Sequence, residues 1–218
     1  MAECGRFKLH VPFTMLVCGG TGTGKTEWLC KLIDNANGLF DKPLKKVIWC
    51  YGISTRRHAQ LALDNRFILN EGLPDTTLID EVVAMEGDGC LLVLDDLAAE
   101  LKKAPELFAN LYSRISHHRC ISVVSILQNL FSVPRTARLN SSYLCILKTT
   151  SDMNFLFSLG RQLFEKEQYK SFIEAYKDAT KNPFGYLFLD LHTRSDDNCR
   201  LLTDIFSRNL TVYVPKKR

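Results

Sequence analysis

The chain has 218 residues, of which 46% are hydrophobic, so it is long enough to bury one sizeable core. Its 28 lysines and arginines against 24 acidic residues give a formal net charge of +4, which permits contact with nucleic acid without indicating it. No apolar run approaches the roughly 20 residues of a membrane-spanning helix, and residues 1–6 lack the apolar core of a signal peptide. We therefore expect one soluble, intracellular domain over 1–218, with a core of about 10–207 and a short basic tail at 214–218.

Apolar, β-branched runs alternate with helical stretches, as in a mostly parallel sheet flanked by helices. The predicted strands are 12–18, 46–51, 90–95, 120–127, 142–148 and 185–191. The predicted helices lie near 25–35, 56–64, 76–85 and 104–116, and across 152–180 with one break. The fold class is therefore α/β.

Eight cysteines are scattered along the chain without a Cys-x-x-Cys pair. Several fall in predicted strands, where a thiol behaves as a small apolar side chain. This distribution favours a reducing compartment over a disulfide framework. His117, His118 and Cys120 lack a second ligand pair, so we favour a structural role for them over a metal site.

A complete Gly-x-x-x-x-Gly-Lys-Thr motif directly follows the first predicted strand. Its glycines let the backbone N–H groups turn toward phosphates, and the next helix adds the positive end of its dipole. The strand before and the helix after disfavour a chance Gly-rich turn. The predicted ATP-binding residues are Gly19, Gly20, Thr21, Gly22, Thr23, Gly24, Lys25 and Thr26. Lys25 is placed to reach the β- and γ-phosphates, and the Thr26 hydroxyl to ligate Mg²⁺.

Two acids follow a buried strand about seventy residues downstream. Four apolar residues directly precede Asp95 and Asp96. Two adjacent carboxylates repel each other, so their presence at the end of a buried strand indicates a bound cation or a catalytic role. We expect Asp95 to hold the Mg²⁺ shell and Asp96 to be the general base that polarises the attacking water. The alternative is that Asp96 only caps the following helix.

A third polar signal ends the predicted strand 120–127. Gln128 follows this strand, and a carboxamide in that place can orient the lytic water and sense the γ-phosphate. The strand that ends at Gln128 follows the acidic strand in the sequence, and this order favours a sensor role over that of an ordinary polar residue at the start of a loop. Arg135 and Arg138 come next, and a planar guanidinium near such a site could act as an arginine finger in trans. Surface arginines are an equally good interpretation.

Together, the phosphate loop, Leu-Val-Leu-Asp-Asp-Leu at 92–97, Ser-Ile-Leu-Gln-Asn-Leu-Phe at 125–131 and the arginine-bearing segment resemble the FtsK–HerA superfamily of DNA-pumping ATPases. The chain is most similar to the viral genome-packaging branch, found in poxviruses, other large DNA viruses, virophages and polintons. Residues 185–191 and 200–206 are similar to the closing strand and tail of that branch. The resemblance covers about residues 10–207.

This resemblance implies a P-loop NTPase core with an additional strand between the phosphate-loop strand and the acidic strand. It implies an ATP- and Mg²⁺-dependent translocase of double-stranded DNA that packages a viral or virus-like genome as a ring, a hexamer or a pentamer. Capsid proteins are further expected partners, and the host cell, in nucleus or cytoplasm, or the virion is the expected location. Many relatives carry Glu where this chain has Asp96, which implies a closer base or an additional water.

The residues themselves leave two other classes open. A small-molecule kinase, for nucleotides or nucleosides, shares the phosphate loop and the length, but the arginine-poor stretch 139–160 offers little for a substrate lid. A nucleotide-gated switch or clamp loader would hydrolyse slowly without translocation. The chain has no Asn-Lys-x-Asp motif for guanine.

Overall fold

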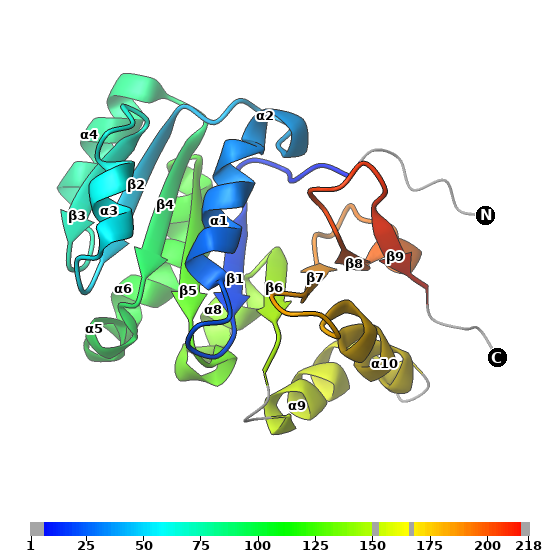
Figure 1. Ribbon diagram of the computed structural model, residues 1–218. Helices are drawn as coiled ribbons and strands as arrows, with labels where there is room; N and C mark the ends of the chain where they lie inside the picture. The colour runs from blue at the N-terminus through cyan, green and yellow to red at the C-terminus, as the bar shows by residue number, and fades with distance from the viewer. Residues whose placement is uncertain (1–6, 150–152, 166–167, 215–218) are drawn as a thin grey trace.

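The computed structural model describes residues 7–149, 153–165 and 168–214. Within them, nine strands form one sheet in the order β3–β2–β4–β5–β1–β6–β7–β8–β9 (Figure 1). The strands are β1 (Thr14–Cys18), β2 (Lys46–Tyr51), β3 (Phe67–Glu71), β4 (Cys90–Asp95), β5 (Ile121–Leu127), β6 (Tyr143–Leu147), β7 (Tyr186–Asp190), β8 (Leu201–Thr203) and β9 (Thr211–Tyr213).

The sheet has a parallel part and an antiparallel part. Strands β3 to β6 along the sheet order are parallel to one another, whereas β7, β8 and β9 pair antiparallel. Strand β5 lies between β1 and β4, so the predicted additional strand between the phosphate-loop strand and the acidic strand is confirmed. The carboxyl ends of β1, β4 and β5 therefore meet at one edge of the sheet.

Helices cover both faces of the sheet, and each face has its own apolar core. One core packs Trp28, Leu29 and Leu32 of α1 against the sheet, together with Leu61 of α3. The other core gathers residues from α4, α6, α9 and α10 on the opposite face. The α-helices are α1 (Lys25–Asp34), α2 (Ala36–Leu39), α3 (Arg56–Leu61), α4 (Thr76–Glu86), α5 (Ala98–Lys103), α6 (Pro105–Asn110), α7 (Ser116–His118), α8 (Arg135–Leu139), α9 (Asn154–Leu163) and α10 (Tyr169–Ala179).

All six predicted strands and the break in the predicted helix 152–180 are confirmed. The predicted helix 104–116 is wrong in detail, because α6 passes into a π-helical turn, η1 (Leu111–Ile115), before α7. That turn points the buried Tyr112 hydroxyl at the Met15 carbonyl, 2.8 Å away, and thereby ties η1 to β1. Six short elements were not predicted: strands β3, β8 and β9 and helices α2, α5 and α8. The structure also has two 3₁₀ turns, η2 (Leu130–Ser132) and η3 (Asp197–Cys199).

The cysteines divide into free thiols and one bonded residue. Six described cysteines are free, and all but Cys120 are buried among apolar side chains. Cys199 is disulfide-bonded, so the expectation of reduced cysteines is not met at this position. The basic tail 215–218 lies outside the described residues. Among the described helices, none combines the length and apolar character that a membrane crossing requires.

Candidate functional site

The phosphate loop connects β1 to α1 through two left-handed glycines. Gly22 has a φ of 76° and Gly24 a φ of 89°, a region in which side chains with a Cβ are disfavoured. Gly24 is also the N-cap of α1, so the helix begins at Lys25 with its amide dipole directed into the loop. The loop at the carboxyl end of β1 therefore has the backbone geometry that the predicted anion-binding nest requires.

Lys25 lies at the centre of this loop, half-buried. Its Nζ donates to the carbonyl oxygens of Gly19 and Gly20 at 2.9 and 2.8 Å. Burial lowers the pKa of Lys25, and the charges of Asp95 and Asp96 oppose that shift. The hydrogen-bond partners of the ammonium are thus neutral carbonyl oxygens, and an anion in the loop would stabilise its charge further.

Asp95 is the last residue of β4 and is only 8% exposed. Burial and the neighbouring charge of Asp96 raise the pKa of Asp95 to about 6, while Trp49, Lys25 and Thr26 lower it. A carboxylate in this environment gains from a cation beside it. Its position at the edge shared with the phosphate loop agrees with the predicted metal-shell role.

Asp96 follows with a left-handed φ of 54° and an exposed side chain. The next helix, α5, is capped by Leu97 without a side-chain hydrogen bond, so the alternative in which Asp96 caps it is not supported. The loop after β2 packs tightly against this turn, since a Cβ on Gly52 would lie 2.8 Å from the Asp96 carbonyl oxygen. The backbone therefore holds Asp96 at the mouth of the site.

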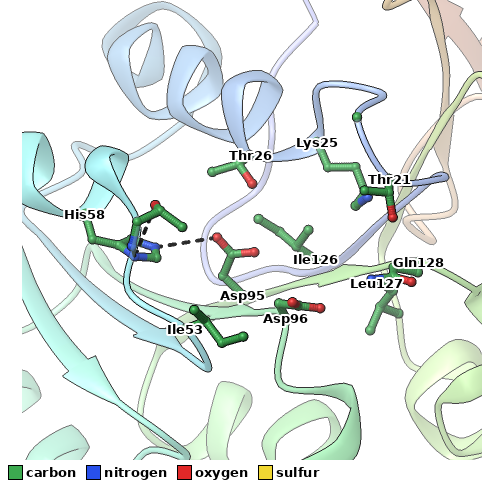
Figure 2. A pocket seen from close by; sticks show the side chains of 12 residues that line it. Thr21, Lys25, Thr26, Ile53, His58, Asp95, Asp96, Ile126, Leu127 and Gln128 are labelled. Carbon is green, nitrogen blue, oxygen red and sulfur yellow. Dashed lines mark hydrogen bonds and ion pairs between the residues drawn. The ribbon is translucent and has the colours of Figure 1, made fainter.

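Gln128 follows β5 and completes the predicted set. It is exposed and faces the same cavity as the acids, whereas its neighbour Asn129 accepts from the Phe131 N–H and caps η2. The cavity has a volume of about 370 Å³ (Figure 2). Its walls come from the phosphate loop, β4, β5 and the segment after β2, and are formed by Thr21, Gly22, Lys25, Thr26, Ile53, Thr55, His58, Asp95, Asp96, Ile126, Leu127 and Gln128.

The arginines lie elsewhere. Arg138 donates to the Val133 carbonyl oxygen at 2.8 Å and its guanidinium lies 4.6 Å from the Phe131 ring centroid. Arg135, on the same short helix α8, is exposed. Neither arginine lines the cavity of its own chain, as a finger acting in trans requires.

Sequence reasoning missed the wall that follows β2. Ile53, Thr55 and His58 line the cavity, and His58 is 3% exposed. Two signals were available: β2 ends at the same edge as β4, and Thr-x-x-His matches the spacing of a capping box, which is formed here between Thr55 and His58.

Phe184 was also missed. It has a left-handed φ of 60°, is 68% exposed, and places its ring edge against Gly24, where a Cβ would approach it to 3.0 Å. It precedes β7, on the side of the phosphate loop away from Asp95. No sequence pattern places it there, because the contact joins residues 160 positions apart.

Magnesium fits this set of residues. The Thr26 hydroxyl and the buried Asp95 carboxylate face the same space (Figure 2), and hard oxygen donors of this kind suit Mg²⁺. Among the residues that the structure describes, no three His, Cys, Asp or Glu side chains form a metal-binding group. A nucleotide-bound Mg²⁺ does not need one, because phosphates and water supply most of its ligands.

Neither a protein-family model nor a curated protein sequence matches the chain. Among solved structures, the DNA-packaging ATPase B204 from Sulfolobus turreted icosahedral virus matches 96% of this chain and 100% of its own, with a TM-score of 0.59 and 12% identity. B204 from Sulfolobus turreted icosahedral virus 2, in complex with ATP-γS, matches with a TM-score of 0.55 and 8% identity over 94% and 98% of the two chains.

A cellular ATPase shows the same architecture. ATPases 2 and 3 of EssC from Geobacillus thermodenitrificans match 95% of this chain and 40% of their own, with a TM-score of 0.56 and 12% identity. Such identities show a shared fold. The predicted α/β fold of a P-loop ATPase is thus confirmed, and the resemblance to viral packaging ATPases is confirmed in fold.

Proposed function

We propose that this chain is an ATP-dependent translocase of double-stranded DNA that packages a viral or virus-like genome into capsids. The observation that carries the proposal is the meeting of phosphate loop, acidic pair and Gln128 around one cavity. A fold shared with a DNA-packaging ATPase over 96% of this chain supports it.

Each residue has a chemical task in this proposal. The loop N–H groups and Lys25 bind the phosphates, while Thr26 and Asp95 hold Mg²⁺. Bound Mg²⁺ neutralises charge that develops on the phosphates. Asp96 accepts a proton from the attacking water, and Gln128 orients that water and responds when the γ-phosphate leaves.

The proposal includes a ring, hexameric or pentameric, with capsid proteins as further partners and the host cell or virion as its place of action. An arginine from a neighbouring subunit would complete each site. Arg135 suits this task better than Arg138, because its guanidinium is exposed while that of Arg138 is bound within its own chain.

Steady-state ATP hydrolysis with and without double-stranded DNA tests the proposal. We expect Mg²⁺-dependent hydrolysis that DNA stimulates, and loss of that activity in Lys25→Ala. Lys31→Ala, in the same helix but exposed and outside the cavity, is the matched control. Hydrolysis without DNA stimulation that also survives Lys25→Ala would contradict the proposal.

Two further measurements separate the alternatives. Transfer of labelled phosphate from ATP to nucleosides or nucleotides would indicate a kinase instead. A chain that hydrolyses ATP without displacing a DNA triplex strand would indicate a switch. For the ring, Arg135→Ala should abolish stimulated hydrolysis while leaving nucleotide affinity unchanged.

A further inference from the structure

One buried side chain in the cavity has no task in the proposed reaction. The His58 side chain is 4% exposed, and its ring stacks on Tyr51 with centroids 4.3 Å apart and planes 22° apart. Trp49 packs edge-on against the same ring at 6.4 Å. Packing on two sides therefore fixes the imidazole where it meets Asp95 (Figure 2).

The hydrogen bonds of His58 define which nitrogen carries the proton. The backbone N–H of Thr55 donates to Nδ1 of His58 at 3.1 Å as part of the capping box at the start of α3. Nδ1 is therefore an acceptor, and a neutral imidazole has its proton on Nε2.

The Nε2–H group is a buried donor without a hydrogen bond among the described residues. A buried donor that makes no hydrogen bond destabilises the folded chain, because it has lost its hydrogen bonds to water. The group faces Oδ2 of Asp95 at 3.9 Å, too far for a hydrogen bond but close enough for a small side-chain rotation to complete one. The indole N–H of Trp49 is likewise buried without a hydrogen bond within normal range, although it influences the same carboxylate.

We propose that His58 is a positioning residue for the metal-shell carboxylate: its Nε2–H donates to one oxygen of Asp95 when Mg²⁺ and nucleotide bind, and directs the other oxygen to the metal. This inference rests on the proposed function. The physical reason is that the terminal bond of a carboxylate has only a broad torsional preference, so an outer hydrogen-bond partner fixes the orientation in which the carboxylate meets the cation. His58 stays neutral throughout and transfers no proton.

Two substitutions distinguish the proposed hydrogen bond of His58 to Asp95 from the role of His58 in the capping box of α3. In His58→Asn, the side-chain oxygen takes the place of Nδ1 and still accepts from Thr55, whereas nothing reaches Asp95. In His58→Gln, the longer amide keeps a donor toward Asp95, and Gln is an accepted partner in a capping box. The Asn variant therefore removes the donor, and the Gln variant restores it.

The measurement is the binding of a fluorescent ATP analogue to the full chain, titrated with Mg²⁺ and repeated in EDTA. For His58→Asn we expect the Mg²⁺ concentration at half-saturation to rise about 10- to 100-fold, the range for partners of metal ligands. Affinity in EDTA should stay within about twofold of wild type, and His58→Gln should recover most of the Mg²⁺ response. Thermal melting checks that both variants fold.

Wild-type NMR gives a second readout that needs no variant. Adding Mg²⁺ and a non-hydrolysable ATP analogue should move the His58 Nε2–H proton signal downfield, as a new hydrogen bond to a carboxylate requires. An unmoved signal, or an Asn variant with the wild-type Mg²⁺ response, overturns the inference. So does an equal loss of affinity in EDTA for both variants, which would assign His58 to packing. A wild-type chain that binds no nucleotide contradicts the proposed function itself.

Discussion

The phosphate-loop cavity and a second cavity among the described residues differ in whether their charged side chains are paired with opposite charges. In the phosphate-loop cavity, Lys25 bonds only to carbonyl oxygens and the Asp95 carboxyl has a raised pKa. The second cavity is larger, with a volume of about 520 Å³, and there Arg200 forms an ion pair with Asp197. The smaller cavity holds the charges that a ligand would stabilise.

A search for the largest cavity would therefore not identify the predicted nucleotide site. A charge that forms an ion pair within the chain gains little from a ligand, whereas a buried carboxylate beside a second carboxylate gains more from a bound cation. Substitutions in the first cavity should change nucleotide chemistry with little loss of stability. Substitutions in the second should do the opposite.

The largest effect is expected from Asp96→Asn. Asn tolerates the left-handed backbone of this position but accepts no proton, so kcat should fall about 10²- to 10⁴-fold while nucleotide affinity stays unchanged. Steady-state hydrolysis and equilibrium binding measure the two quantities. Asp197→Asn, in the second cavity, is the control and should keep the wild-type kcat. A loss below tenfold for Asp96→Asn would show that another group is the base.

Gly24→Ala should weaken nucleotide binding at least about tenfold. The left-handed φ of 89° strains any residue with a Cβ by roughly 1–2 kcal/mol, and that Cβ would lie 3.0 Å from the Phe184 ring. Gly20→Ala is the matched control in the same loop, because its Cβ meets only a methyl group of Thr23 at 3.7 Å. Isothermal titration with ATP compares the two variants, and equal affinities would contradict the proposed loop geometry.

Asp95→Asn should stabilise the metal-free protein while removing its Mg²⁺ response. The folded pKa of about 6 lies above the usual 3.8, so the folded chain binds this proton more tightly than the unfolded chain does. The stability contribution is therefore present at low pH and is lost as the pH rises through about 6. At pH 7 the variant should gain about 1–3 kcal/mol in free energy of unfolding.

Denaturant unfolding between pH 4 and pH 7.5 measures this difference. It should shrink as the pH falls to about 4, because the folded carboxyl is then protonated and the unfolded one, with its usual pKa of 3.8, is partly protonated. A variant that is less stable than wild type at pH 7 would show that the carboxylate is well satisfied in the metal-free chain.

The sequence predicted the part of the site that follows directly from strand ends. Buried apolar runs identify β1, β4 and β5, and parallel pairing then brings Lys25, Asp95 and Gln128 to one edge without further information. The positions of these side chains are thus a consequence of hydrophobic patterning.

The positions of the residues that the sequence did not predict depend on tertiary contacts. His58 reaches the site because α3 turns back over the end of β2, and Phe184 because β7 returns beside β6 after two helices. Both contacts depend on how loops close in three dimensions, which hydrophobic periodicity does not encode. The short strands β8 and β9 were missed for a related reason, since three-residue segments carry too little pattern to be distinguished from loops.

The smallest effect is expected from Arg138→Ala in the second cavity. Its hydrogen bond to the Val133 carbonyl and its contact with the Phe131 ring would be lost, at a cost of about 1–2 kcal/mol in free energy of unfolding. Hydrolysis per folded chain should stay unchanged, because the bound guanidinium contributes to its own chain's structure. Arg138→Lys keeps the charge without the planar contact and should be intermediate in stability. If Arg138→Ala instead abolished hydrolysis at wild-type stability, Arg138 would be the arginine that acts on a neighbouring subunit, and Arg135 would not.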